Sequence, residues 1–311
     1  MADQISVPCD IAIPQVFHDG PVDMDLVRRH VETAEGIGYH GLWVQERFIG
    51  ESPTLEGLSL LCYVAALTEK VRLGISVVVA PNHNPVHLAK QFSTMDRMCN
   101  GRLTIGLGLG SRAHENQVMG GAPDRRIRYF MEGLQVMKAL WQEPKVTHHG
   151  HFWDLDEMEM EPKPVQKPYP PVWFGGHHPD ALMRAVRHGD GWMGAGSSST
   201  DQFKQHVATI QETMESAGRD PATFSISKRV YLAMDDNEAR AERRLREWFG
   251  RHYGSADMGS QVSVWGSPSR CAEALAEIVD GGAQMLMLNP VFDQMEHLEG
   301  LKKALNFPAA S

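Results

Sequence analysis

The sequence is short of basic residues and has no long apolar run. Its 311 residues include 30 Lys and Arg against 39 Asp and Glu, which gives a formal net charge of −9. Binding to nucleic acid or to an anionic membrane surface needs clustered positive charge, so neither partner is expected. No stretch of about 18 apolar residues is present to form a transmembrane helix. These absences indicate a soluble protein.

Cysteine motifs and a targeting signal are also missing. The four cysteines are scattered and none forms a CxxC pair, which is typical of reduced, mostly buried thiols. They are Cys9, Cys62, Cys99 and Cys271. Residues 1–4 contain an acid and no basic side chain, so no signal peptide is expected there. We therefore predict a cytoplasmic protein.

A dinucleotide-binding fingerprint is a third absence. The glycines Gly106, Gly108 and Gly110 lack the further glycine that this fingerprint requires, and they lie in the middle of the chain. We interpret them as part of a strand whose backbone approaches a cofactor or a neighbouring chain closely. A simple exit from a strand into a loop is the alternative interpretation.

Short β-branched runs alternate with longer amphipathic runs, which predicts a parallel α/β sheet. The same helix–glycine–strand junction recurs at Gly38, Gly189–Gly191 and Gly281–Gly282, which indicates a repeated unit. We expect one domain over residues 1–311, a (β/α)8 TIM barrel. The strands are expected near 5–13, 41–45, 71–79, 102–109, 171–174, 190–194, 223–233 and 284–289. The helices are expected near 23–37, 56–67, 85–98, 125–142, 179–188, 200–217, 268–280 and 293–305.

Two connections are too long for a minimal barrel. Residues 143–170 predict a loop with a small hairpin, and residues 235–266 contain an extra charged helix from Asn237 to Gly250. Long insertions in barrels commonly lie at the C-terminal mouth and cover the site. We expect both insertions there.

The segment from Lys70 to Gly110 resembles the luciferase-like monooxygenase family. Three further segments agree with it, in the right order and spacing: Gly38–Arg47, Glu161–Pro168, and Pro171–Gly176 followed by Asp190–Trp192. The resemblance covers most of the chain. It implies that the protein is an FMN-dependent two-component monooxygenase or an oxidoreductase that uses the deazaflavin coenzyme F420.

The resemblance implies a surface that supports the ring of such a cofactor and a site that binds its phosphate. Ser76 and Val77 would form a bulge with a cis peptide bond under the ring, although the residues alone are typical of an ordinary buried strand. Gly175 and Gly176 would hold the ribityl phosphate before a helix N-terminus, and a plain turn is the alternative. Ser197 would add a hydroxyl donor, unless it belongs to a simple flexible loop.

Catalytic side chains are expected where the strands end. The F420 branch of the family commonly has an acid followed by a histidine at the second strand, and here the pair is Glu46 and Arg47. An arginine stays protonated and does not pass a proton on, so it would hold an anionic substrate or stabilise the reduced ring. A surface ion pair is the alternative for Glu46 and Arg47. His114 is the candidate titrating group, or a solvent-facing loop histidine.

Departures from the family pattern bear on the substrate. Ser111 and Ser198 stand where F420-dependent sugar-phosphate dehydrogenases have a glutamate and a lysine, which disfavours a sugar phosphate. His18, Phe48 and Trp265 are candidates to line the substrate pocket. The histidines at 148–151 and 177–178 lack acids or cysteines at ligand spacing, so no metal site is expected.

Three functions are consistent with these observations. The first is hydride transfer between F420 and a small organic substrate, and the second is an FMNH₂-dependent monooxygenase that uses O₂ and is supplied by a separate reductase. The third is a flavin-binding relative without turnover. A flavin or F420 reductase is a possible partner, and the helices expected at Pro85–Met98 and Arg126–Trp141 predict a homodimer.

Overall fold

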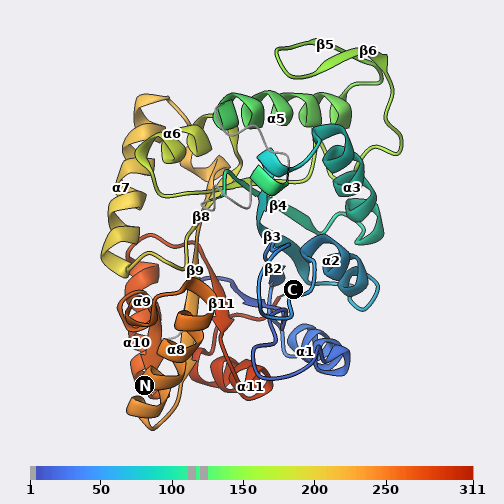
Figure 1. Cartoon of the computed structure of the whole chain (residues 1–311). Helices are drawn as coiled ribbons and strands as arrows, with labels where there is room; N and C mark the ends of the chain where they lie inside the picture. The colour runs from blue at the N-terminus through green and yellow to red at the C-terminus, as the bar shows by residue number, and fades with distance from the viewer. Residues whose placement is uncertain (1–4, 111–116, 120–124, 311) are drawn as a thin grey trace.

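The computed structural model describes residues 5–110, 117–119 and 125–310 and contains a closed barrel of eight parallel strands (Figure 1). The barrel closes where β8 pairs with β9. All eight predicted strands are confirmed. They are β1 (Cys9–Ala12), β2 (Gly41–Val44), β3 (Arg72–Val79), β4 (Leu103–Gly108), β7 (Val172–Gly175), β8 (Gly191–Gly194), β9 (Ser225–Met234) and β11 (Met285–Pro290).

Eight helices form a ring around these strands, as Figure 1 shows along the barrel axis. Each lies within a few residues of its prediction. They are α1 (Met24–Gly36), α2 (Gly57–Ala65), α3 (Pro85–Met98), α5 (Arg126–Gln142), α6 (Pro179–His188), α7 (Thr200–Ser216), α10 (Pro268–Asp280) and α11 (Gln294–Leu305). Local chemistry sets their ends: the Asp23 carboxylate accepts the N–H of Leu26, and Gly38 adopts a φ of +88° after α1.

The second insertion lies at the carboxyl end of β9, as predicted. It comprises α8 (Glu238–Tyr253), α9 (Ala256–Val262) and β10 (Val264–Gly266), and β10 pairs in parallel with the end of β9. Because the carboxyl ends of the strands form the barrel mouth, α8 is placed to contribute side chains to it.

The first insertion differs from the prediction in its place. It forms the hairpin β5 (Val146–His149) and β6 (Asp154–Met158), but this hairpin leaves the end of α5 and packs outside the barrel (Figure 1). Glu132 of α5 accepts the backbone N–H groups of residues 151–153. A segment between a helix and the next strand starts at the amino ends of the strands. Of the two predicted insertions, the second is therefore the one that lies at the mouth.

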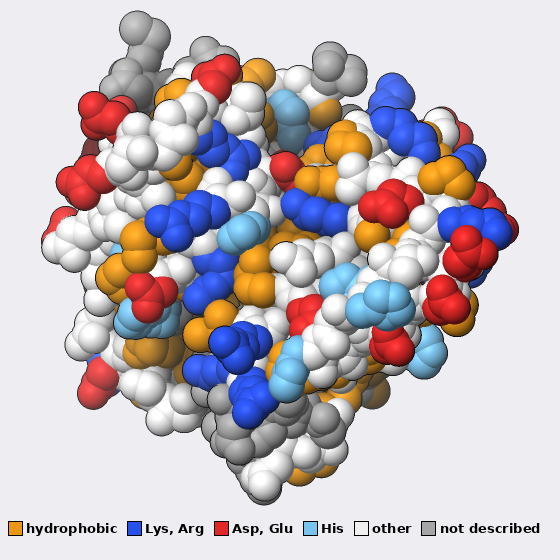
Figure 2. Space-filling model, turned by 90° about the horizontal axis from the view of Figure 1, so that it is seen from above, with side chains coloured by type: hydrophobic (Ala, Val, Ile, Leu, Met, Phe, Trp, Pro, Cys, Tyr) orange, Lys and Arg blue, Asp and Glu red, His pale blue; other side chains and the backbone are white. Residues whose placement is uncertain are grey.

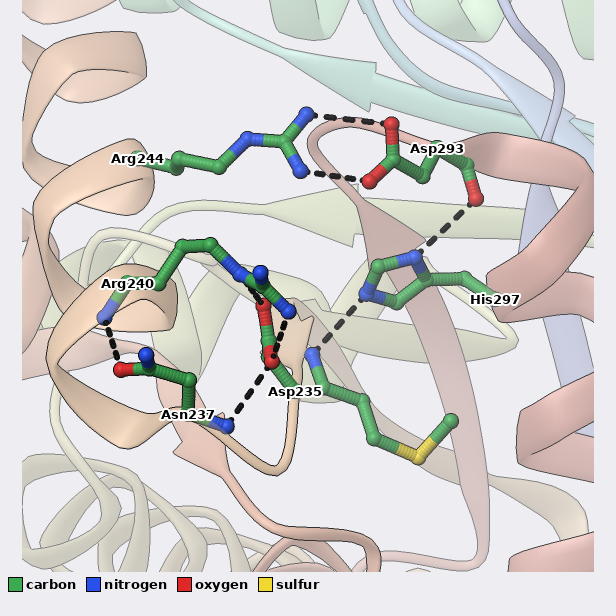
Figure 3. A network of polar contacts seen from close by, with 7 residues as sticks. Asp235, Asn237, Arg240, Arg244, Asp293 and His297 are labelled. Carbon is green, nitrogen blue, oxygen red and sulfur yellow. Dashed lines mark hydrogen bonds and ion pairs between the residues drawn. The ribbon is translucent and has the colours of Figure 1, made fainter.

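A polar network fixes the start of α8 to the barrel (Figure 3). Arg240 donates to both oxygens of Asp235, at 2.5 and 2.7 Å, and Arg244 does the same to Asp293, at 2.5 and 3.0 Å. His297 accepts the N–H of Met234 at Nε2, so its Nδ1 donates to the carbonyl of Asp293. The Arg240 guanidinium lowers the pKa of Asp235 to about 2. Both ion pairs thus remain formed at neutral pH.

The barrel interior contains one buried acid below the mouth. Asp10 of β1 is 4% exposed and accepts the indole N–H of Trp43 at 2.5 Å. Trp43 stacks on Trp173 in a small interior cluster. Burial raises the pKa of Asp10 to about 6, although the Trp43 hydrogen bond acts in the opposite direction. The ionised form of Asp10 is therefore destabilising in the folded protein.

Replacing this acid with Asp10→Asn is expected to stabilise the protein in a pH-dependent way. The folded protein retains the Asp10 proton between the ordinary pKa of 3.8 and about 6, so wild-type stability falls as the pH rises through this window. The difference in pKa corresponds to about 3 kcal/mol. Denaturant unfolding at pH 4 and pH 8 measures it: the advantage of the variant should grow toward pH 8. An advantage that is equal at both values would contradict the prediction.

Candidate active site

A cavity of about 550 Å³ opens at the carboxyl ends of the strands. Residues at the ends of β2, β3, β4, β7 and β8 form its walls together with Arg229 from the middle of β9, and the end of α8 supplies His252 and Tyr253. This volume is within the range of small-molecule and cofactor sites. The mouth of this barrel thus has room for a ligand of cofactor size.

The floor of the cavity is the bulge of β3. The pairing register with β4 shifts between Ile75 and Val78, and the Ser76–Val77 peptide bond is cis. Both features confirm the bulge that the resemblance implies. Ser76 and Val77 both line the cavity.

Glycines of the neighbouring strands make room for this bulge. A Cβ atom at Gly108 or at Gly175 would lie 2.8 Å from a methyl carbon of Val77, and one at Gly106 would overlap the carbonyl oxygen of Ile75. The close approach at these glycines is therefore to the neighbouring strand β3. The sequence left open an approach to a cofactor or to a neighbouring chain segment, and at Gly106 and Gly108 the structure shows an approach to the neighbouring strand β3.

Glu46 connects the end of β2 to the end of β3. Its side chain is 2% exposed, Oε1 accepts the N–H of Val79 at 2.9 Å, and Oε2 lies 2.7 Å from Nε2 of His83. Glu46 also lines the cavity. It thus holds the strand that forms the floor. His83 was missed in the sequence because nothing in its spacing distinguishes it from a loop histidine.

Arg47 lies on the wall of the cavity beside the insertion. Its Nε donates to the carbonyl of Ile49 at 3.2 Å, and Nη1 lies 3.3 Å from Nδ1 of His252. A guanidinium only donates, so Nδ1 of His252 accepts and the ring carries its proton on Nε2. Trp248 stacks on the His252 ring at 4.4 Å. The insertion therefore places an oriented histidine next to Arg47.

The turn after β7 is built for close backbone contact. Gly176 has a φ of +129°, which side chains rarely adopt, and α6 begins three residues later. Nδ1 of His178 caps the helix by accepting the N–H of Asp180. Arg184 lines the same end of the cavity, and burial lowers its pKa. Helix N-termini and arginines both favour anions, so this end is suited to a phosphate.

The loop after β8 is held from below by a buried lysine. Lys228 is 2% exposed; its Nζ donates to the carbonyl of Ala195 and to the carbonyl and hydroxyl oxygens of Ser198, the last two at 2.8 Å. Burial lowers the pKa of Lys228 to about 7. Because Ser198 binds this lysine, Ser197 is the serine of this loop that lines the cavity.

The structure brings most of the predicted site residues together, but not all. Glu46, Arg47, Phe48, Ser76, Val77, Gly108, Gly110, Gly175, Gly176 and Ser197 all line the cavity. His18 lies behind His252, with 6.1 Å between ring centroids, and hydrogen-bonds to Ser52. Trp265 lies on β10, where it donates to the carbonyl of Ser260. His114 and Ser111 lie outside the described residues.

The charge of the cavity is predominantly positive. Among the described residues, four arginines and one acid, Glu46, line it; the arginines are Arg47, Arg126, Arg184 and Arg229. The arginines of the cavity favour an anionic ligand despite the negative net charge of the chain. The outer face on the side that carries α5 differs, because basic, acidic and histidine side chains are interspersed on it (Figure 2).

The histidine pairs of the chain form ordinary polar contacts. His149 pairs with Asp154, and His148 lies 3.6 Å from Glu132. In the described part of the chain, no group of three or more His, Cys, Asp or Glu side chains is placed to hold a metal ion. Among the same residues, no helix combines the length and apolar character needed to span a membrane.

The fold and the cavity define a (β/α)8-barrel with a ligand site at its C-terminal mouth. The chain belongs to the luciferase-like monooxygenase family, whose model matches residues 11–285. An F420-dependent glucose-6-phosphate dehydrogenase of Kineococcus radiotolerans is 28% identical over 225 residues, which are 69% of this chain and 66% of that relative. An FMNH₂-dependent dimethylsulfone monooxygenase of Pseudomonas putida is 26% identical over 255 residues, or 79% and 69% of the two chains.

Solved structures are similar over nearly the whole chain. An F420-dependent secondary alcohol dehydrogenase, solved with an F420–acetone adduct, superposes with a TM-score of 0.83 at 19% identity, covering 97% of this chain and 99% of the other. At this identity the likeness shows the fold. Relatives thus use either F420 or FMN, and the family comprises oxidoreductases and monooxygenases.

Proposed function

We propose that this luciferase-like oxidoreductase transfers a hydride between coenzyme F420 and a small organic substrate. The observation that carries the proposal is the bulged Ser76–Val77 floor of a 550 Å³ cavity, held by the buried carboxylate of Glu46. The F420-dependent relative at 28% identity supports the choice of cofactor. When bound, the deazaflavin supplies the carbon that accepts or releases the hydride.

In this proposal the residues of the chain bind and orient the cofactor. Ser76 and Val77 lie under the ring, and Gly108 and Gly110 border it on β4 and the following loop. Gly175, Gly176 and Ser197 hold the phosphate, with Arg184 adding charge beside them. The fit is supported by the end of the cavity where the N-terminus of α6 and Arg184 lie.

Residues above the floor would hold the substrate. Phe48, 43% exposed, and Tyr253 line the rim, and the imidazole of His252 lies deeper beside Arg47. This combination suits a small substrate with an apolar part and an oxygen atom that accepts a hydrogen bond. His114 remains the proposed group for transfer of a proton to or from that oxygen.

Two kinds of partner belong to the proposal. An F420 or flavin reductase would regenerate the cofactor in solution. A second copy of the chain would pack through α3 and α5, the helices predicted to carry the dimer surface.

The proposal is tested by turnover with purified protein under anaerobic conditions. F420 is mixed with a panel of small alcohols, and its absorbance is followed; loss of the oxidised absorbance with at least one alcohol is expected. Oxygen consumption that requires FMN and a flavin reductase, with no F420 reduction, would replace the proposal with a monooxygenase. Cofactor binding without either reaction on a broad substrate panel would leave a binding protein.

A further inference from the structure

A charged side chain from β9 reaches the floor of the cavity from inside the barrel. Arg229 lines the cavity and donates through Nη1 to the carbonyl oxygen of Ser76 at 3.3 Å. Its Nη2 donates to Oε1 of Gln45 at 3.0 Å, and its Nε to Oδ1 of Asn289, also at 3.0 Å. The guanidinium is therefore hydrogen-bonded directly to the peptide that forms the floor.

In the described part of the chain, the hydrogen-bond partners of Arg229 are all neutral. Its hydrogen-bond acceptors are two side-chain amides and one backbone carbonyl, and its guanidinium lies 4.9 Å from the centre of the Tyr231 ring. The ion pairs among residues 5–110, 117–119 and 125–310 do not include Arg229. A half-buried positive charge that has no counter-ion among these described residues is costly, and an anion that arrives with a ligand would balance it.

The other three arginines that line the cavity lie away from its floor. Arg184 lies on α6 at the Gly176 end, and Arg47 faces His252 on the opposite wall. Arg126 lies at the start of α5. Arg229 is the arginine bonded to the floor itself, so its charge acts where a ring resting on Ser76 and Val77 would lie.

We infer that Arg229 stabilises the negative charge that the cofactor ring gains on reduction. The inference rests on the proposed function, in which the ring lies on Ser76–Val77. A hydride carries one proton and two electrons, so an oxidised ring that receives it gains one negative charge. A fixed guanidinium next to the ring favours that charge without any rearrangement. Arg229 therefore makes the reduced cofactor bind more tightly than the oxidised one.

The test compares the affinities of oxidised and reduced cofactor for Arg229→Met under anaerobic conditions, with FMN and F420 as the two probes. The variant should weaken binding of the reduced form at least about tenfold more than binding of the oxidised form. For this two-electron couple, tenfold corresponds to about 30 mV in the reduction potential of the bound cofactor. Arg184→Gln is the matched control, and it should weaken both forms to the same extent.

A second variant separates charge from shape. Asn289→Asp keeps the acceptor atom that Arg229 binds but places a carboxylate beside the guanidinium, so the preference for the reduced form should also fall. If the ratio of the affinities for reduced and oxidised cofactor is unchanged in Arg229→Met and Asn289→Asp, the inference is overturned. Arg229 would then have only a structural role, in stabilising the bulge. Failure of the wild-type protein to bind either cofactor would overturn the proposed function as well.

Discussion

Replacing Gly106 with alanine is expected to destabilise the barrel and to abolish cofactor binding. The added methyl group would overlap the carbonyl oxygen of Ile75 and lie 3.3 Å from the Cα of Ser76. Both are backbone atoms of the bulge, so no side-chain rotation relieves the overlap. Overpacking of this kind costs about 3 kcal/mol. The free energy of unfolding, from denaturant titration, and the dissociation constant of F420 or FMN measure the two effects.

Two other glycines provide graded controls for this prediction. Gly20 is exposed, and no atom lies within 4 Å of the point that an added methyl group would occupy, so Gly20→Ala should change neither quantity. Gly108→Ala meets a methyl group of Val77, which is a side-chain contact, and should have an intermediate effect. Wild-type stability and affinity in Gly106→Ala would show that the bulge does not depend on the packing of β4 against β3.

Replacing Glu46 with alanine is expected to weaken cofactor binding about 10- to 100-fold. The variant removes the acceptor of the Val79 N–H and the partner of His83, so the end of the floor strand is no longer held. Loss of a hydrogen bond to a charged group costs about 1.5–3 kcal/mol, which gives this range. Equilibrium titration with oxidised cofactor measures it. Glu46→Gln retains an acceptor of the same shape and should bind much more tightly than the alanine variant.

Glu35, at the start of β3, provides the control for this prediction. Glu35 accepts the N–H groups of Lys70 and Val71, at 2.7 and 3.1 Å, immediately before β3 begins. Glu35→Ala removes the same kind of bond far from the cavity, so it should lower stability and leave cofactor affinity unchanged. Equal losses of affinity in both alanine variants would mean that Glu46 acts through general stability and not through the floor.

The strands and helices could be predicted because their signals are local. Asp23 caps its helix with its own side chain, and Gly38 takes the left-handed conformation that ends it. The place of the hairpin at residues 146–158 could not be predicted from such signals, because it depends on hydrogen bonds from three backbone N–H groups to Glu132, which lies 19 to 21 residues earlier in the chain.

The same distinction applies to the site. Gly175 and Gly176 lie where β7 ends and Ser76 and Val77 lie in the bulge of β3, and the family resemblance located all four of them. His252 was missed because its position depends on how the insertion folds back over the mouth.

Lys228 and Arg229 could have been recognised in the sequence as residues of the site. They are two adjacent charges in a strand whose other residues are uncharged. One is buried beneath the β8 loop and the other faces the barrel interior, as the alternation of side chains along a strand requires. Charged pairs in a buried barrel strand therefore mark residues with a potential role at the mouth.

The central claim is that this barrel binds a deazaflavin over the Ser76–Val77 floor. Equilibrium titration of the purified protein with oxidised F420, followed by fluorescence and run in parallel with FMN, tests it most directly. We predict saturable F420 binding with a dissociation constant on the order of micromolar or lower, weaker binding of FMN, and loss of F420 binding in Gly106→Ala. Tight binding of FMN with no binding of F420 at micromolar concentrations would contradict the account.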